Sequence, residues 1–392
     1  MLLLAFLICF SFCNSQQIIH LNSLKGYNFK NPINSKPPYS VYISANRDSD
    51  DILSQVYIKS ESGSLQNLLY LKNSSKNSNS NLLAATEIQE NSFLISKLTD
   101  YQLYSLTGFL YITNSSQADD KKFQVYDVNQ QFAISTEANK DHTLVFLNSK
   151  SQNHSSTISS WLQSPSCLVS MYQGFPQEDQ KENLVIFSNP APFFTQPLFI
   201  PHVEKFEVNF EIFHFKTSGS MKFDISPEPF NFDGYKTTAY RTTGFYMKSQ
   251  YDNTNRTATV SCLRDTSYNG TTGLLIGASR VRPYSTVRFD FDDGPHYILD
   301  LGIRGINIEK IPKSLEISTN GTEDGEVYVQ YLIWQDQLIP STLAPTTTML
   351  PETTTKGCLG IFGGGILMII VLFNFLNANF FSDFGPLNVR RL

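Results

Sequence analysis

The most constraining feature of this sequence is a period of two in its apolar residues, which recurs in the middle of the chain. Phe206-Glu-Val-Asn-Phe-Glu-Ile212 alternates apolar and polar residues, and Met221-Lys-Phe-Asp-Ile225 repeats the pattern after the turn sequence Thr217-Ser-Gly-Ser220. Successive side chains of a β-strand point to opposite faces, so the pattern predicts strands with one buried face and one exposed face. Turn residues between two such runs predict a β-hairpin.

Shorter apolar runs, separated by Gly, Asn, Ser and Pro clusters, predict further strands, and Val327–Ile333 is expected to be the last one. No soluble segment shows helical spacing with a cap, so the predicted fold class is all-β, with jelly-roll-like β-sandwiches. The remaining strand predictions are Ser40–Ile43, Gln55–Ile58, Leu68–Leu71, Phe109–Ile112, Thr143–Leu147, Leu184–Phe187, Thr257–Leu263, Thr286–Phe291 and Tyr297–Leu301.

Composition excludes several classes of protein. With 41% hydrophobic residues and a net charge of −5, the chain is too apolar and too weakly charged to be disordered. Its 30 Lys and Arg face 35 Asp and Glu, so no basic surplus indicates nucleic-acid binding.

The two ends of the chain are hydrophobic. Residues 1–15 contain an uncharged apolar run of about a dozen residues, too short to span a bilayer, followed by small residues. This pattern is typical of a secretory signal peptide cleaved after Ser15. Between Lys356 and Asp383 lie 26 uncharged residues, which are enough for a membrane-spanning helix at 357–379.

The charges that flank this span predict its orientation. Arg390 and Arg391 follow it, so the positive-inside rule places the tail 380–392 in the cytoplasm. The expected protein is a single-pass type I protein of the plasma membrane, with an extracellular head. A lipid-anchor signal is the alternative, although charged residues follow the apolar run and no polar spacer precedes it.

Domain boundaries follow from composition and length. Residues 337–356 are rich in Thr and Pro and resemble an O-glycosylated stalk. The remaining head exceeds one ordinary sandwich, which predicts two β-sandwich domains, 16–129 and 130–336. Its stretch from Phe187 to Phe232 is rich in Phe, which indicates core strands or else an exposed aromatic patch.

Glycosylation sequons and cysteines support an extracellular head. Two thiols remain after the signal peptide and the membrane edge are set aside, so Cys167 and Cys262 are expected to form one disulfide, with two buried free thiols as the alternative. Six Asn-x-Ser/Thr sequons all precede the stalk, as expected for lumenal acceptors. They are at Asn73, Asn114, Asn153, Asn255, Asn269 and Asn320.

No motif for nucleophilic catalysis, metal binding or phosphate binding occurs, and the six His are scattered. The sequence therefore predicts no catalytic residues, no metal and no cofactor. Acidic residues cluster at Asn46–Asp51 and at Phe289–Gly294, and they are interpreted as solvated turns, with Ca²⁺ ligation as the alternative.

The layout resembles that of nematode surface and secreted proteins with CUB-like domains. Strand–turn stretches such as Gly108-Phe-Leu-Tyr-Ile-Thr-Asn-Ser-Ser116 carry the resemblance, across residues 16–336. It implies a non-catalytic sandwich for extracellular interaction in host defence.

The function expected is binding of an extracellular protein or glycan by a non-catalytic head that is held at the membrane by a C-terminal helix. One alternative is an extracellular hydrolase or lectin-like enzyme that uses carboxylates brought together in space, among them Asp290, Asp292 or Asp293. Another is a structural coat or matrix component.

Overall fold

A computed structural model of the chain describes most of the expected head. All of the described residues belong to one compact unit. The predicted signal peptide, nearly all of the stalk, the predicted membrane helix and the tail lie outside the described residues. The described residues are 16–75, 81–149, 154–176, 185–191, 197–231, 241–249, 252–262, 268–280, 284–291, 293–298, 306–308, 312–320 and 326–338.

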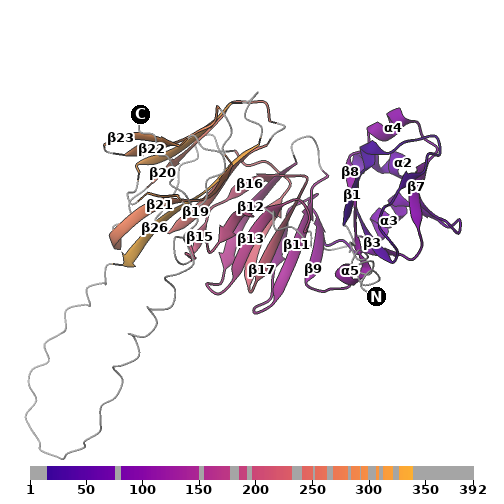
Figure 1. Ribbon diagram of the computed structural model, residues 1–392, viewed down its shortest axis with the longest axis horizontal. Coiled ribbons are helices and arrows are strands. Elements are labelled where there is room, and N and C mark those ends of the chain that lie inside the picture. The colour runs from indigo at the N-terminus through magenta and orange to yellow at the C-terminus, as the bar shows by residue number, and fades with distance from the viewer. Residues whose placement is uncertain are drawn as a thin grey trace, which may run out of the picture. The chain divides into compact units, whose positions relative to one another are not determined.

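The N-terminal part is a sandwich of two four-stranded sheets, with strand orders β1-β8-β3-β6 and β2-β7-β4-β5 (Figure 1). If the strands are lettered B to I along the chain, the orders read B-I-D-G and C-H-E-F. This order defines a jelly roll, in which two Greek keys wrap eight strands into two packed sheets. The strands are β1 (Gln17–His20), β2 (Asn31–Pro32), β3 (Tyr39–Ala45), β4 (Val56–Ser60), β5 (Leu65–Asn67), β6 (Thr86–Ile88), β7 (Ser92–Ser96) and β8 (Gly108–Asn114).

The next part of the chain has the same strand order. Its sheets are β10-β18-β12-β16 and β14-β13-β17-β11-β9, in which β9 is an additional strand parallel to β11. Without β9, the orders again read B-I-D-G and C-H-E-F. The strands of this second jelly roll are β9 (Phe123–Asp127), β10 (Phe132–Ser135), β11 (Asp141–Leu147), β12 (Ser155–Gln163), β13 (Leu168–Gln173), β14 (Val185–Asn189), β16 (Phe206–Asn209), β17 (Ile212–Ser218) and β18 (Met221–Ser226).

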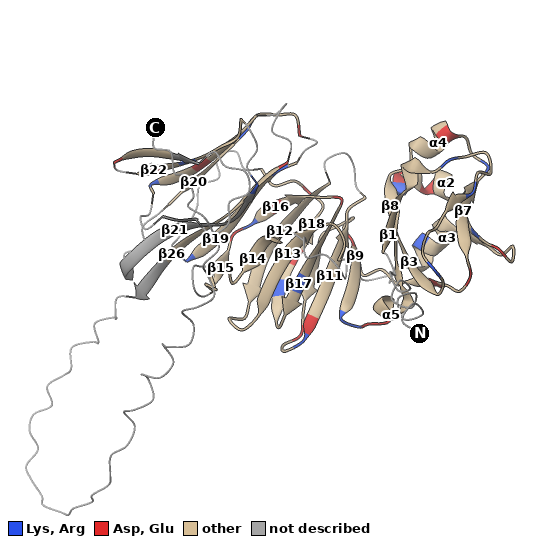
Figure 2. Cartoon of the chain, in the orientation of Figure 1, with Lys and Arg blue, Asp and Glu red and all other residues tan. Residues whose placement is uncertain are grey.

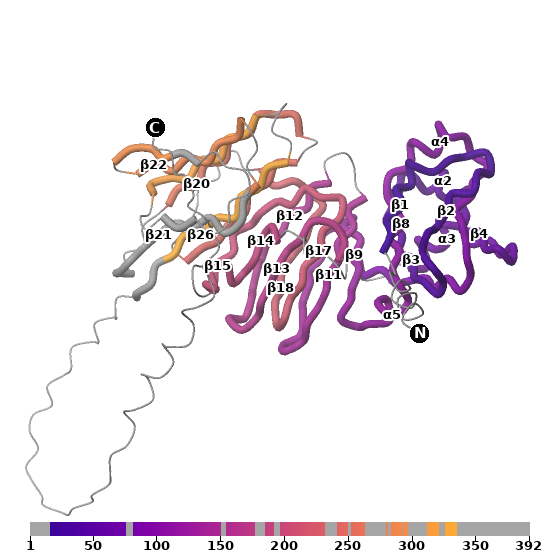
Figure 3. Tube along the Cα trace, viewed as in Figure 1, coloured from indigo at the N-terminus to yellow at the C-terminus, as the bar shows by residue number. Residues whose placement is uncertain are grey.

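A third jelly roll follows, with sheets β15-β19-β26-β21-β24 and β20-β25-β22-β23. Its additional strand β15 comes from the second jelly roll's loop between β14 and β16, and it runs parallel to β19. The strands are β15 (His202–Val203), β19 (Thr242–Lys248), β20 (Arg256–Ser261), β21 (Tyr268–Arg280), β22 (Thr286–Phe291), β23 (Gly294–Ile298), β24 (Ile306–Ile308), β25 (Ser314–Thr319) and β26 (Val327–Leu338). Apart from β15, each jelly roll is one continuous stretch of chain, as the colour ranges in Figure 3 show.

The all-β fold class is therefore confirmed, but the described residues contain three sandwiches where the sequence predicts two. The predicted second domain, 130–336, holds both the second and the third jelly rolls. Eight short strands with tight turns need only about 100 residues per sandwich, fewer than the length rule of about 150 per domain assumes.

The alternating stretch Met221–Ile225 is a strand, as predicted, but Phe206–Ile212 is divided between β16 and the start of β17, and the expected hairpin is wrong. β17 lies in one sheet of the second jelly roll and β18 lies in the other, where it pairs with β10 and β12. The turn between them, with Gly219 at φ +126°, passes the chain across the sandwich. Period two indicates which face of a strand is buried and not which strand it pairs with.

The described residues include four short α-helices that the sequence did not predict, all in the first part of the chain, and two of them illustrate how such helices are capped. Leu68–Leu71, predicted to be a strand, belongs to α3 (Leu68–Ser74), where the Asn67 side chain accepts a hydrogen bond from the Tyr70 N–H at 3.0 Å. The helix α4 (Asp100–Tyr104) begins with a capping box formed by Thr99 and Gln102. Such caps satisfy backbone N–H groups that have no partner inside the helix, and they stabilise very short helices.

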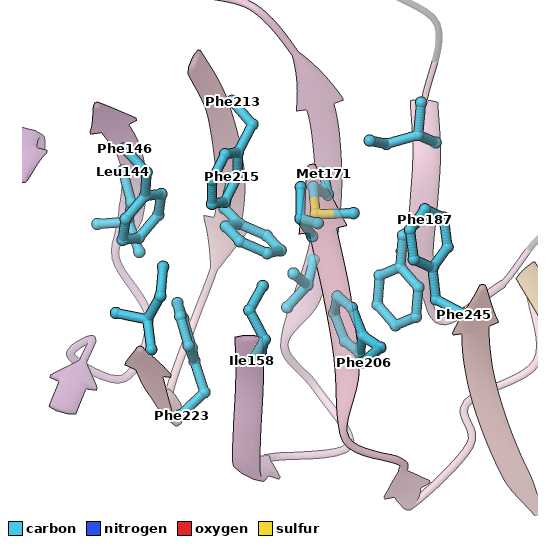
Figure 4. Packing of buried hydrophobic residues seen from close by; sticks show 14 of the residues in the cluster. Leu144, Phe146, Ile158, Met171, Phe187, Phe206, Phe213, Phe215, Phe223 and Phe245 are labelled. Atoms are coloured by element: carbon cyan, nitrogen blue, oxygen red, sulfur yellow. The ribbon is translucent and has the colours of Figure 1, made fainter. Parts of the chain in front are cut away.

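The core of the second jelly roll is aromatic. Rings from its two facing sheets point toward one another in Figure 4: Phe146 of one sheet lies 6.0 Å from Phe223 of the other, centroid to centroid, and stacks on Phe213 of its own sheet at 5.0 Å. Trp161 stacks on Phe223 at 5.5 Å. Phe187 and Phe206 from the Phe-rich stretch are completely buried. These buried rings confirm the interpretation of that stretch as core strands.

The third jelly roll completes this core. Phe245, Met247 and Tyr328, from β19 and β26, belong to the same buried cluster as the Phe residues of the second jelly roll. The opposite face of the same two strands packs into the third jelly roll's own core, for example through Tyr246 and Val329. All seven residues of β19 are buried for this reason.

Candidate binding surface

The acidic residues proposed for a hydrolase do not form a pair of facing carboxylates among the described residues. The carboxylate of Asp290 accepts hydrogen bonds from Arg288 Nε at 2.9 Å and from Ser314 Oγ at 3.2 Å. Asp292 lies outside the described residues, and Asp293 is exposed in the turn before β23. Asp290 therefore ties β22 to β25.

The other acidic stretch, Asn46–Asp51, forms a short 3₁₀ turn that leads into α2 (Asp50–Leu53). The carboxylate of Asp50 pairs with the ammonium of Lys72, which is only 2% exposed and also donates to the carbonyl of Asn46 at 3.3 Å. Within the described part of the chain, no group of three or more His, Cys, Asp or Glu is arranged to hold a metal ion.

Cys167 and Cys262 are both free thiols, so the structure does not support the predicted disulfide. Cys167 is buried in the aromatic core of the second jelly roll, where its Sγ lies 3.7 Å from Thr217 Oγ1. Cys262 packs at the edge of the third jelly roll's core. The cysteine count suggested a pair, but the fold places the two residues in different hydrophobic cores. Burial raises the pKa of the Cys262 thiol to about 12.

The sequons remain predicted glycosylation sites. Asn73 in α3 and Asn255 before β20 are exposed. Asn114 and Asn320 are half-buried, and the Asn114 side chain caps α5 (Ser115–Ala118) by accepting from the Gln117 N–H at 2.6 Å. Asn269 is in β21, and Asn153 lies outside the described residues.

The most prominent surface feature of the first jelly roll is a group of exposed aromatic rings, here called the tip surface. Its members are Tyr27, 70% exposed, Phe29, 49%, Tyr101, 88%, and Tyr104, 74%. The first two lie in the loop between β1 and β2, and the last two lie on α4, between β7 and β8. A large exposed aromatic ring is costly in water, so several on adjoining segments indicate an interaction site.

Hydrogen bonds join the two segments that carry these rings. The Tyr27 N–H donates to the Leu98 carbonyl and the Asn28 N–H donates to the Ser96 carbonyl, both at 2.8 Å. The Gly26 N–H donates to Asp100 Oδ1 at 2.6 Å. A Cβ on Gly26 would lie 2.0 Å from the Leu98 carbonyl oxygen, so only glycine allows this approach.

The backbone of the loop is held in an uncommon conformation. Tyr27 and Asn28 have φ of 53° and 61°, in the left-handed region that residues other than glycine rarely adopt. The buried Asn31 side chain holds the base of the loop: it accepts from the Lys25 N–H at 2.8 Å and donates to the Lys25 carbonyl at 2.9 Å. The rings therefore stand on a rigid backbone, which lowers the entropy lost on binding.

Charges around the tip surface are mixed. Lys25 lies over the Phe29 ring with Nζ 5.1 Å from its centroid, whereas Asp100 lies at the start of α4. Figure 2 shows acidic and basic residues on α2, α3 and α4 and mostly uncharged strands. The tip surface is therefore aromatic without a dominant charge.

Sequence patterns did not identify this surface, because its rings lie in a loop and a helix where no alternation exists. One signal was present: Thr99-Asp-Tyr-Gln102 matches the capping-box pattern and predicts a helix start, which would have placed Tyr101 and Tyr104 on one short helix. The contact of this helix with the Tyr27 loop comes only from the fold.

The strand orders define a mostly β protein made of jelly rolls, with exposed aromatic rings on its first jelly roll. A family model described as a transmembrane glycoprotein matches residues 36–372. The chain belongs to this transmembrane glycoprotein family and is a membrane-anchored surface protein. This match overturns the expected resemblance to nematode CUB-like proteins, which rested on the layout and on strand–turn stretches common to many β-sandwiches.

No curated protein matches the chain significantly. Among solved structures, the chain is similar to one described as "The Triple Jelly Roll Fold and Turret Assembly in an Archaeal Virus". The identity is 9%, the alignment covers 81% of this chain and 80% of the other, and the TM-score is 0.17. Since so low a score carries no argument, the jelly-roll assignment rests on the strand orders alone.

In the described part of the chain, no helix is long and apolar enough to cross a membrane. The predicted helix at 357–379 lies outside that part.

Proposed function

We propose that this glycoprotein attaches the membrane that carries it to an extracellular protein, which the tip surface of the first jelly roll recognises without catalysis. In this proposal the helix at 357–379 spans the plasma membrane in type I orientation and the Thr/Pro-rich segment is a stalk. The observation that carries the proposal is the set of four exposed rings on two segments joined by hydrogen bonds.

The chemistry of these rings favours a protein partner. Tyrosine combines a flat apolar ring with a hydroxyl and loses little side-chain entropy, and it is enriched among the residues that dominate protein interfaces. Protruding rings on a rigid backbone can fill pockets in a protein partner. The mixed charges at the tip give no preference for a strongly charged ligand.

The test is a binding screen with the full-length glycoprotein in nanodiscs against arrays of extracellular protein domains and of glycans. We expect binding to a protein domain that Tyr101→Ser or Tyr27→Ser weakens at least about 30-fold, as for a hot-spot residue worth about 2 kcal/mol. The matched control is Tyr284→Ser, because Tyr284 is 68% exposed, has a φ of 70° and lies in the third jelly roll.

Equal weakening by Tyr284→Ser, or full binding by both tip variants, would contradict the proposal. Binding to glycans alone, with the protein array silent, would show that the partner class is wrong. Hydrolysis of an arrayed glycan would favour the alternative of an extracellular hydrolase.

A further inference from the structure

The first jelly roll has a small polar pocket of about 160 Å³, here called the edge pocket. It is lined by residues of β4, β5, β6 and β7, of which β5 and β6 are the edge strands of the two sheets. Ser60 of β4 and Ser92 of β7 pair there. At the other end of β7, the Ser96 carbonyl accepts from the Asn28 N–H of the loop that carries the tip surface. The edge pocket and the tip surface therefore lie at opposite ends of β7.

Serine hydroxyls form part of the pocket wall. Ser60 is more than nine-tenths buried, and its Oγ lies 2.8 Å from Ser62 Oγ and 2.8 Å from Ser64 Oγ. It also accepts a hydrogen bond from the Ser64 N–H at 3.0 Å. Since each hydroxyl can donate one hydrogen bond and accept two, this wall offers a ligand both kinds of hydrogen bond.

Gln66 of β5 supplies an acceptor that has no partner. Its Oε1 is buried and makes no hydrogen bond to any residue that the structure describes. Gln66 pairs with Ile58 of β4, and both residues line the pocket. Leaving a buried carbonyl oxygen unpaired costs about 1–3 kcal/mol, and native proteins rarely do so. The position of this oxygen therefore points to a ligand that donates a hydrogen bond to it.

The charges of the edge pocket are negative. Glu87 and Glu90 line it, and no Lys, Arg or His does so within the described part of the chain. The hydroxyl of Ser62 first, and with it the Ser60 hydroxyl and the Ser62 N–H, donate hydrogen bonds that lower the pKa of Glu90. Its carboxylate is therefore an ionised acceptor at neutral pH. The two carboxylates repel an anionic ligand.

The turns at the rim of the pocket are joined by backbone hydrogen bonds. The Glu61 N–H, in the turn between β4 and β5, donates at 3.0 Å to the Asn91 carbonyl, in the turn between β6 and β7. Gly63 has a φ of +97°, and its N–H donates to the Ser60 carbonyl at 3.0 Å. Because this backbone is already ordered, little conformational entropy is lost when a ligand binds.

We propose that the edge pocket binds one neutral sugar residue at the end of an extracellular glycan. The hydroxyls of a sugar can donate to Gln66 Oε1 and to the Glu90 carboxylate, and they can accept from the serine hydroxyls. A protonated amine would suit the carboxylates, but it has no acceptor for those hydroxyls. The C–H groups of the ring contact Ile58 and Ile88, which belong to the core of this jelly roll.

The size of the edge pocket limits the ligand to one ring. Pockets for drug-sized ligands have volumes of about 300–1,000 Å³, and this one is smaller. The remainder of the glycan therefore extends into solvent. Sugar binding here is a second activity of the head, and it does not depend on the protein partner of the tip surface.

The test measures sugar binding by the full-length glycoprotein in nanodiscs. The first probes are the methyl glycosides of galactose, glucose, mannose and N-acetylglucosamine, followed by saturation-transfer NMR. The second probes are immobilised glycans with these terminal residues, each with and without a covering sialic acid. We expect binding to at least one neutral glycoside and to its glycan. Sialic acid should weaken that binding at least about 10-fold, because its carboxylate approaches Glu87 and Glu90.

Gln66→Leu removes the amide at nearly constant volume. It should weaken sugar binding at least about 10-fold, as expected for a lost hydrogen bond to a buried acceptor. The melting temperature should stay the same or rise, because the variant loses a buried oxygen that has no partner in the protein, whereas a structural role of Gln66 would lower it. The matched control is Gln55→Leu at an exposed glutamine of the same jelly roll, which should bind as the wild type does.

If Gln66→Leu does not fold, Glu90→Gln at an exposed position decides the question. This variant should reduce the discrimination against sialic acid, since one of the two repelling charges is removed. Discrimination that stays as strong as in the wild type would reject the site.

The proposal is overturned if none of the neutral glycosides or glycans binds, or if sialic acid makes no difference to binding. Full binding by Gln66→Leu, or an equal loss in Gln55→Leu, would place the sugar elsewhere. Binding of Nα-acetyl-lysine methylamide in place of the sugars would show that the ligand class is wrong. Tyr101→Ser should bind sugars normally, so a failure of the edge pocket and a failure of the tip surface are distinguished.

Discussion

At the scale of single residues, Lys72 is the clearest case of a charge whose position is set by its partners. Its ammonium is almost completely buried, and the described residues supply it with the Asp50 carboxylate and the Asn46 carbonyl. The side chain of Asp50 is 37% exposed and can still be hydrated. Only the Lys72 ammonium is fully removed from water. Replacing Asp50 and replacing Lys72 should therefore lower the free energy of unfolding by different amounts.

We expect Asp50→Asn to destabilise the first jelly roll by about 3 kcal/mol, because it leaves a buried ammonium without a carboxylate. Lys72→Met should cost only about 1 kcal/mol, since the remaining carboxylate reaches water and the methionine fills the space. Native-state hydrogen exchange of residues 46–75 measures both local stabilities. The account is wrong if Lys72→Met is the more damaging change.

At the scale of elements, one buried glutamine in β26 adds hydrogen bonds to the apolar junction of the second and third jelly rolls. Gln330 is completely buried, and its Nε2 donates to the Ser188 carbonyl at 2.8 Å while its Oε1 accepts from the Ser188 N–H at 3.0 Å. Ser188 is in β14, the last strand of its sheet, whose outer side has no neighbouring strand. The amide side chain thus satisfies backbone groups that an additional strand would otherwise pair.

Replacing Gln330 by Ala should destabilise this junction by at least about 2 kcal/mol, because a buried N–H and a buried carbonyl of β14 lose their partners. Gln173→Ala is the matched control: Gln173 is exposed and makes one bond, to Glu326, so its loss should cost less than about 0.5 kcal/mol. Urea unfolding of the purified glycoprotein compares the two variants. If both variants lose the same free energy of unfolding, the hydrogen bonds of Gln330 to Ser188 make no specific contribution to stability.

At the scale of the whole molecule, the chain repeats one topology three times and then, by the proposal, ends in an anchor. The described head finishes at the end of β26, and the Thr/Pro-rich segment follows it. The family match extends to residue 372, into the apolar run. In the proposed function, the run after Lys356 attaches the head to the membrane.

Truncation after residue 356 should therefore release the head into the medium with its fold intact, because all the described packing precedes that position. Secretion and far-UV circular dichroism of the truncated protein test this expectation.

In the full-length protein, a tag after Leu392 should be digested by protease added outside sealed microsomes, because the proposed type I orientation places this end in the cytoplasm. A protected tag would exclude the type I orientation.

The positions of many strands could be predicted from the sequence, but the pairing of the strands and their division into domains could not. Alternation located strands such as β18 and β22 because a period of two is a local consequence of one buried face. The partner of β18, the count of three sandwiches and the contact of α4 with the Tyr27 loop depend on pairings between distant segments. The exposed rings of the tip surface come together only through those pairings.

The sequence by itself determined the β-rich class, the buried faces of many strands and the hydrophobic run near the C-terminus, because each is a property of neighbouring residues. Only the tertiary structure decided that the strands form three jelly rolls, that Cys167 and Cys262 belong to separate cores, and that Tyr42 and Tyr111 of the first jelly roll share a buried cluster with the second. Strand pairing and burial between domains minimise the free energy of the whole chain, and no local pattern encodes which distant surfaces meet.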